Sequence, residues 1–217
     1  PFLEGRLRSP EMLGPLAPDN IEKRALYGLF DYGDSHGDGG WGNVESYNDF
    51  SILLLGLRNG DPEFLRQGFA SARHYRDVDI HQVRGHCITH SPNHVMGGGS
   101  FSHAWPQGVY SHYLLTGCRR SREVALRNGE NMLNAEDIES GNRTLGRFLV
   151  NLTDIFQVTG DRRYLDRFHA QLDHAVKLLD ARKDPRYPTL FGVGDGLVPY
   201  HGWYGCTALI KMFRETG

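Results

Sequence analysis

The chain has 217 residues and a formal net charge of −2, which is enough length for one large domain with a sizeable core. The sequence holds no dense cluster of Lys and Arg, and this excludes a surface built to follow nucleic-acid phosphates. The longest apolar run, residues 52–55, is far shorter than a membrane span, so neither nucleic acid nor a membrane is expected as a partner.

The N-terminal part, residues 1–42, is expected to be an entry segment and polar loop that packs on a helical domain. It does not resemble a signal peptide. The loop, DYGDSHGDGGWGNVESY at residues 31–47, combines acidic and amide side chains with many glycines. Because glycine lets a backbone approach a ligand closely, this composition favours a loop shaped around a polar molecule.

A helical hairpin is expected next, starting near residue 43. Its first helix has an apolar face made of Val44, Tyr47, Ser51, Leu54 and Leu57. After a turn at residues 58–60, Asp61 is a good N-cap and Pro62 suits the first helical position. The second helix continues an apolar stripe through Leu65, Phe69 and Ala72.

A second polar segment follows the hairpin and is rich in histidine. Eleven histidines occur in the chain, and the segment carries five of them: His81, His86, His90, His94 and His103. Two polar loops on a helical scaffold predict a site for a hydroxyl-rich molecule such as a sugar.

The rest of the chain is also predicted to be helical. Helices are expected over residues 106–115, ending at Gly117, over 121–133, and from Gly202 to the C-terminus. Two stripes mark the clearest helices, Leu145, Leu149, Leu152 and Phe156, then Leu165, Phe168, Leu172, Ala175 and Leu179 after the cap Asp161.

The helices repeat one plan, in which a helix ends at glycine, a polar residue follows and a second helix begins. LRNGDPEFL, LLTGCRRSREVAL and FQVTGDRRYL all follow it. Stacked hairpins of this kind predict an all-α fold, either an open solenoid or an α/α toroid. Short turns alternate with long polar loops, which favours an incomplete α/α toroid that forms a single domain over residues 1–217. The chain is expected to be a fragment of a larger multi-domain protein.

Three stretches, DYGDSHGDGGWGNVESYND, DVDIHQVRG and HAWPQGVYSHYLLTG, resemble the α/α-toroid domain of the YetA-like exo-rhamnogalacturonan lyases. The resemblance covers roughly residues 25–135 and implies a secreted polysaccharide lyase that degrades pectin. It carries no residue-by-residue catalytic assignment.

A lyase acting on a uronic acid must neutralise the carboxylate, remove the C5 proton and protonate the leaving oxygen. His and Tyr suit the proton transfers, and Arg, Asn or Gln suits the carboxylate. The catalytic candidates are His81, His86, His90, His103 and Tyr204. The substrate-binding candidates are His36, Trp41, Asn43, Arg84, Trp105, Gln107, Tyr200, His201 and Trp203.

No cofactor is expected, although two groups offer metal ligands. Asp34 and Asp38 either cap turns in the glycine-rich loop or hold Ca²⁺. His90 and His94 continue a spacing of four from His86 that can bind a divalent metal, but the proline at position 92 breaks a helix there.

Other functions stay open at this point. A glycoside hydrolase would use a carboxylate pair from Asp34, Asp38 and Glu45. A sugar epimerase would also use histidine, and a non-catalytic carbohydrate-binding toroid would need no catalytic group. The three cysteines, Cys87, Cys118 and Cys206, form no CxxC pair and leave one disulfide open. An extracellular or periplasmic location fits pectin, and a cytoplasmic one fits unpaired thiols.

Overall fold

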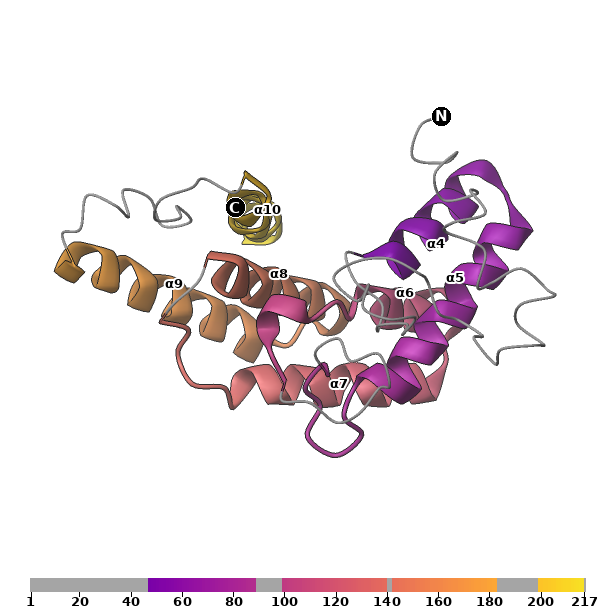
Figure 1. Ribbon diagram of the computed structural model, residues 1–217, viewed down its shortest axis with the longest axis horizontal. Coiled ribbons are helices and arrows are strands. Elements are labelled where there is room, and N and C mark those ends of the chain that lie inside the picture. Colours follow the sequence, from indigo (N-terminus) through magenta and orange to yellow (C-terminus); the bar gives the residue numbers. More distant parts are fainter. Residues whose placement is uncertain (1–46, 89–98, 140–141, 183–198, 217) are drawn as a thin grey trace, which may run out of the picture. The chain divides into compact units, whose positions relative to one another are not determined.

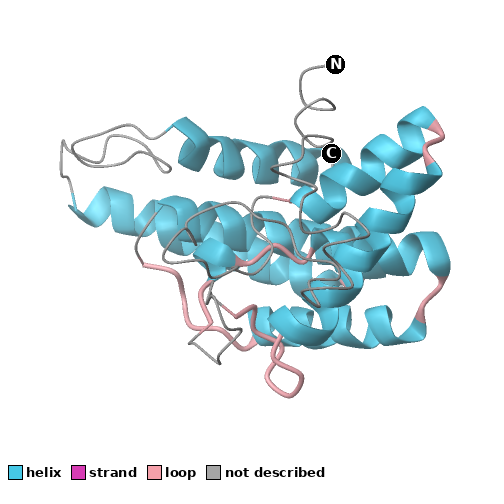
Figure 2. Ribbon diagram, turned by 45° about the vertical axis from the view of Figure 1, so that its right-hand side comes forward, coloured by secondary structure: helices cyan, strands magenta, loops and turns pink. Residues whose placement is uncertain are grey.

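The computed structural model describes residues 47–88, 99–139, 142–182 and 199–216 (Figure 1). These residues contain the α-helices α4 (Asn48–Asn59), α5 (Pro62–His74), α6 (Gln107–Thr116), α7 (Arg119–Leu133), α8 (Asn142–Thr159), α9 (Arg162–Arg182) and α10 (Pro199–Thr216). Figure 2 shows helices and loops but no strand in this part of the chain, which confirms the all-α prediction. The expected entry segment, residues 1–42, lies outside the described residues.

The chain divides into two compact units. Unit 1 ends at Gly99 and resumes over residues 105–128, and unit 2 comprises residues 100–104 and 129–217. Within unit 1, helices α4, α5 and α6 pack against one another. Within unit 2, α8 packs against α9 and α10 and against the short turn η3 (Phe101–His103).

Glycine ends three helices, as the repeat predicts. Gly60, Gly117 and Gly160 follow α4, α6 and α8 with φ of 63°, 67° and 67°. Glycine adopts this left-handed conformation readily, and its backbone N–H then donates a hydrogen bond to one of the last carbonyls of the helix. Three consecutive helix pairs are therefore joined by the same kind of short turn.

The α5 cap has the predicted form. The Asp61 carboxylate accepts hydrogen bonds from the backbone N–H groups of Glu63 at 3.0 Å and Phe64 at 3.2 Å, and Pro62 begins the helix. These bonds satisfy donors that the first helical turn would otherwise leave unpaired.

We expect Asp61→Ala to lower the free energy of unfolding by about 1 kcal/mol, because the cap acceptor is lost. Asp61→Asn is the matched control, since its amide oxygen still accepts the same bonds. Urea denaturation of both variants tests this, and an equal loss in the two would contradict the capping role.

The predicted apolar face of α4 is wrong. Leu54 and Leu57 are 48% and 50% exposed, whereas Ile52 and Leu53 are buried. The reason is a close helix contact: an added Cβ at Gly56 would lie 2.8 Å from the Leu65 side chain, and one at Gly68 would lie 2.7 Å from the Leu53 side chain. Helix α4 turns Gly56 toward α5, and Leu54 and Leu57 therefore lie on its exposed side.

The stripes of α8 and α9 are confirmed in the described residues. Leu145, Leu149, Leu152, Leu165, Phe168 and Ala175 are buried, and Phe156 and Leu172 are half-buried. Helix α7 begins two residues before its predicted start at position 121, and α10 begins at Pro199 rather than Gly202.

Candidate functional site

A tight turn in unit 1 brings two of the predicted catalytic histidines together. Helix α5 ends in a π-helical turn, η2 (Tyr75–Asp79), and the chain then reverses between the bridged residues Ile80 and Cys87. The backbone N–H of His81 donates to the His86 carbonyl at 2.9 Å. The two imidazole rings lie with their centroids 4.9 Å apart.

The His81 ring is oriented by the turn itself. Its Nδ1 accepts hydrogen bonds from the backbone N–H groups of Val83 at 3.2 Å and Arg84 at 3.1 Å. The ring is half-buried, while the Arg84 side chain on the same turn is exposed.

The His86 ring is half-buried against Gly99, where an added Cβ would lie 2.7 Å from the ring. Partial burial lowers the pKa of His86 below its ordinary 6.5, and electrostatic interactions with His81 and Arg84 lower it further. His86 is therefore mainly neutral at neutral pH.

Helix α7 packs against the turn and forms hydrogen bonds with it. Gly85 has φ +77°, and its backbone lies so close to the backbone of Arg127 that an added Cβ would be 2.2 Å from the Arg127 carbonyl oxygen. The buried Asn128 amide donates to the Gly85 carbonyl at 2.7 Å and accepts from the Tyr110 hydroxyl at 2.6 Å. Arg127 also donates to the Gln82 carbonyl.

We expect Asn128→Ala to lower the free energy of unfolding by about 2–3 kcal/mol, because a buried hydroxyl and a buried carbonyl lose their partner. The exposed Asn134, whose amide donates to the carbonyl of Glu130 at 2.8 Å, provides the control Asn134→Ala, with an expected change below about 0.5 kcal/mol. Equal effects in thermal denaturation would show that the Asn128 bonds contribute little.

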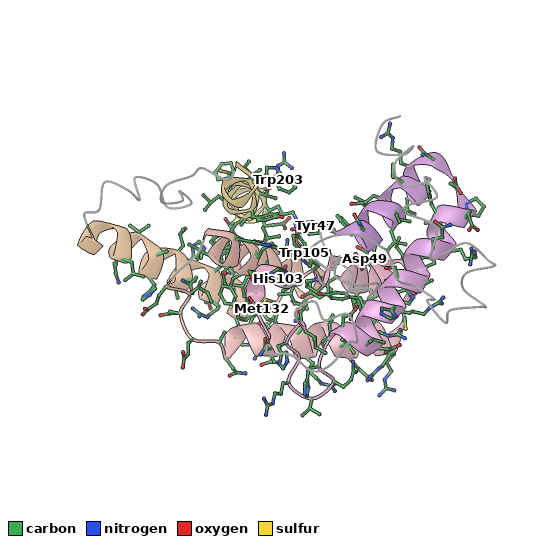
Figure 3. The ribbon with its side chains drawn as sticks, in the orientation of Figure 1. Tyr47, Asp49, His103, Trp105, Met132 and Trp203 are labelled. Atoms are coloured by element: carbon green, nitrogen blue, oxygen red, sulfur yellow. The ribbon has the colours of Figure 1, made fainter. Side chains whose placement is uncertain are left out.

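A buried acidic group also lies in unit 1. Asp49, labelled in Figure 3, is 0% exposed, and one oxygen accepts from the backbone N–H of Phe50 at 2.8 Å. The other oxygen has no hydrogen-bond partner among the described residues and faces Gly108, where a Cβ would be 1.7 Å away. Burial raises the pKa of Asp49 to about 7, and the negative charge of Asp79 adds to the rise. Nothing in the sequence identified this group, because an acidic residue in the first helical turn is ordinarily a solvated one.

The candidates in unit 2 lie on η3 and α10. His103 contacts Arg143, with 3.2 Å between Nδ1 and the guanidinium, and Arg143 also donates to the Ser102 carbonyl at 2.9 Å. Tyr204 is buried, with the guanidinium of Arg147 5.3 Å from its ring centre. Trp203, labelled in Figure 3, is 58% exposed.

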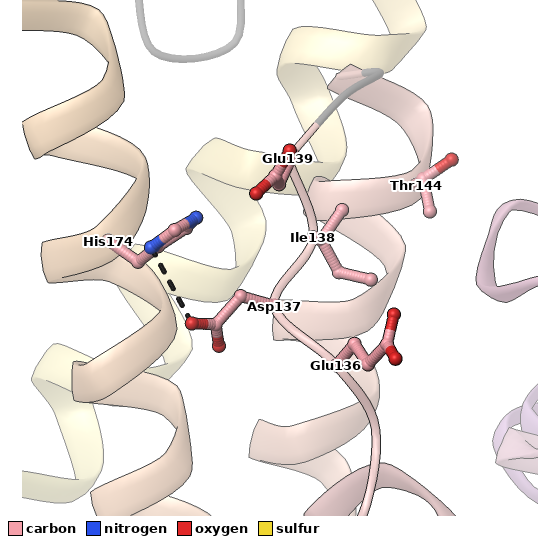
Figure 4. Close-up of a pocket in the computed structure, with 6 residues that line it drawn as sticks. All are labelled: Glu136, Asp137, Ile138, Glu139, Thr144 and His174. Carbon is pink, nitrogen blue, oxygen red and sulfur yellow. Dashed lines mark ion pairs between the residues drawn. The ribbon is translucent and has the colours of Figure 1, made fainter. Parts of the chain in front are cut away.

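Unit 2 also contains an open, acidic depression of about 710 Å³ (Figure 4). It is lined by Glu136, Asp137, Ile138, Glu139, Thr144 and His174. Asp137 pairs with Arg167 at 2.8 Å and with His174 at 3.5 Å, so its charge is already matched within the chain. No sequence pattern marks these residues as a site.

The remaining candidates have other positions. Trp105 and Gln107 are buried in unit 1, and the Trp105 ring packs edge-on against Tyr47 at 4.8 Å (Figure 3). Tyr200 and His201 belong to α10. Eight candidates lie outside the described residues: Asp34, His36, Asp38, Trp41, Asn43, Glu45, His90 and His94.

Among the described residues, no group of three or more His, Cys, Asp or Glu side chains could hold a metal ion. Cys87, Cys118 and Cys206 form no disulfide in the described part of the chain. The helices in the described ranges are all too short or too polar to span a membrane. No protein-family model, curated protein or solved structure matches the chain.

Proposed function

We propose that the protein is a polysaccharide lyase that cleaves a uronic-acid-containing glycan, such as rhamnogalacturonan, by β-elimination. The observation that supports this most is the turn at residues 81–86, where two imidazole rings lie 4.9 Å apart and Arg84 belongs to the same turn. Imidazole transfers protons near neutral pH, and arginine pairs with carboxylates, so one short turn carries the groups that elimination from a uronate requires.

The proposed scaffold is an incomplete α/α toroid. Its support is the repeated turn chemistry at Gly60, Gly117 and Gly160, which joins three successive helix pairs. In unit 2, taken by itself, His103 and Tyr204 are proposed for proton transfer and the exposed Trp203 for contact with a sugar face. A pectin substrate favours an extracellular or periplasmic location.

The experiment is continuous near-ultraviolet absorbance, which detects the unsaturated uronate product, during incubation with rhamnogalacturonan and with polygalacturonate. Wild type should give a rising signal, and His86→Gln should lower the rate by about 10²–10⁴-fold because proton transfer is lost. His169→Gln is the control, since His169 lies on an exposed part of α9. New reducing ends without absorbance would instead indicate a hydrolase, and binding without either product would indicate a carbohydrate-binding module.

A further inference from the structure

We propose that the two histidines of the turn have different, fixed roles: His81 is a hydrogen-bond donor through Nε2, and His86 is the proton acceptor. This assignment rests on the proposed lyase function for its chemistry, but its structural part stands on hydrogen bonds of the turn. It separates two residues that the sequence treats alike.

The hydrogen bonds of His81 determine its tautomer. A neutral imidazole carries one proton, and the nitrogen that accepts hydrogen bonds is the one without it. Because Nδ1 accepts from both Val83 and Arg84, the proton lies on Nε2. To accept a proton at Nε2, the neutral ring would need its own proton on Nδ1, facing the two backbone N–H groups that now donate to it. His81 is thus poorly suited to be the base and well suited to donate.

The ring nitrogens of His86 are available for proton transfer. Its ring forms no hydrogen bond with any described residue, and it is half-buried rather than enclosed. Neither ring nitrogen is thereby committed to a tautomer. Partial burial, with the neighbouring His81 ring and the Arg84 side chain, disfavours a positive charge on His86, so the ring rests in the neutral form that a base requires.

Arg84 completes the assignment on the same turn. Its guanidinium is exposed, and none of the described side chains pairs with it. A uronate carboxylate is a planar anion that a guanidinium binds well. Arg84 and the Nε2–H of His81 would together stabilise the negative charge that develops on this carboxylate as the C5 proton leaves.

The step then balances within the turn. A nitrogen of His86 forms a bond to the C5 proton, and the C5–H electron pair becomes the C4–C5 double bond. The C4–O4 bond breaks, and O4 leaves with its electron pair. The His86 imidazolium returns the proton to O4, which restores the neutral base without any further reactant.

The test is the tautomer of each histidine, measured by two-dimensional ¹H–¹⁵N correlation of the imidazole nitrogens in the full chain at neutral pH. His81→Gln and His86→Gln identify the two signals by their loss. We expect His81 to show a protonated Nε2 and an unprotonated Nδ1, and His86 to be neutral. A protonated Nδ1 on His81, or a charged His86, would overturn the assignment.

The catalytic arm uses variants that separate the roles. His81→Gln keeps an amide donor close to the Nε2 position and should retain activity within about tenfold, whereas His81→Phe and His86→Gln should lose about 10²-fold or more. Added imidazole should restore activity to His86→Gly but not to His81→Gly, and the reverse pattern would overturn the roles. A wild type without product would refute the lyase function, while the tautomer measurement would still decide the assignment.

Discussion

Asp49→Asn is expected to remove a loss of stability of about 4 kcal/mol that the wild type shows between about pH 4 and about pH 7. The Asp49 carboxyl is fully buried, and its pKa is raised from 3.8 to about 7. The folded protein therefore holds a proton that the unfolded chain releases at a much lower pH. Each pH unit across that interval lowers the free energy of unfolding by about 1.4 kcal/mol.

Desolvation decides the direction of this effect. The position of Asp49 in the first turn of α4 and its bond from the Phe50 N–H both favour the ionised form, by amounts on the order of 1 kcal/mol. Burial of a charge without a partner costs several kcal/mol and is the larger effect. The neutral acid is therefore the form that the fold accommodates below about pH 7.

The sign follows from proton counting. Below about pH 4 the group is protonated in both states and contributes no pH dependence, and above about pH 7 it is ionised in both. Stability should fall only between these limits. Urea denaturation of wild type and Asp49→Asn across this pH range measures the difference between their free energies of unfolding. Other titrating groups contribute equally to both proteins, so their effect cancels in this difference. Parallel curves for the two proteins would show that Asp49 is not buried as a neutral acid.

The sequence predicts helices best where caps and stripes agree. Asp61 and Pro62 mark the start of α5, and the leucine spacing of α8 and α9 identifies their buried faces. In both cases the signal is local, because a cap bonds within one turn and a stripe follows the helical period.

The buried face of α4 could not be predicted in this way. Its sequence, SILLLGL, offers apolar residues on every side, so the period does not select one. The choice comes from α5, where Gly68 admits the Leu53 side chain and Leu65 contacts Gly56. Such complementarity between two helices exists only once both are packed.

The candidate site also has features that the sequence predicts and features that it does not. The residue types alone suggested His81, Arg84 and His86, and their closeness follows from a short turn. The Nδ1 bonds of His81 and the support by Asn128 depend on backbone geometry that no residue pattern encodes. The buried Asp49 was missed because burial of a polar residue is a tertiary property.

The second large effect concerns the turn itself: we expect Gly85→Ala to lower the free energy of unfolding by about 3 kcal/mol or more. A side chain at φ +77° costs about 1–2 kcal/mol, and the added Cβ would overlap backbone atoms of Arg127, which cannot move aside as a flexible side chain can. The turn must then leave α7 and lose the Asn128 bond.

Gly117→Ala is the matched control, because Gly117 has φ +67° with nothing within 4 Å of the added Cβ. It should cost only the backbone strain of about 1 kcal/mol. Thermal denaturation gives the two losses, and the imidazole ¹⁵N signals of His81 and His86 should shift in Gly85→Ala alone. Equal losses of stability in the two variants would mean that the contact of Gly85 with α7 does not restrict the size of the residue there. Unchanged imidazole signals would mean that the histidine geometry is independent of this contact.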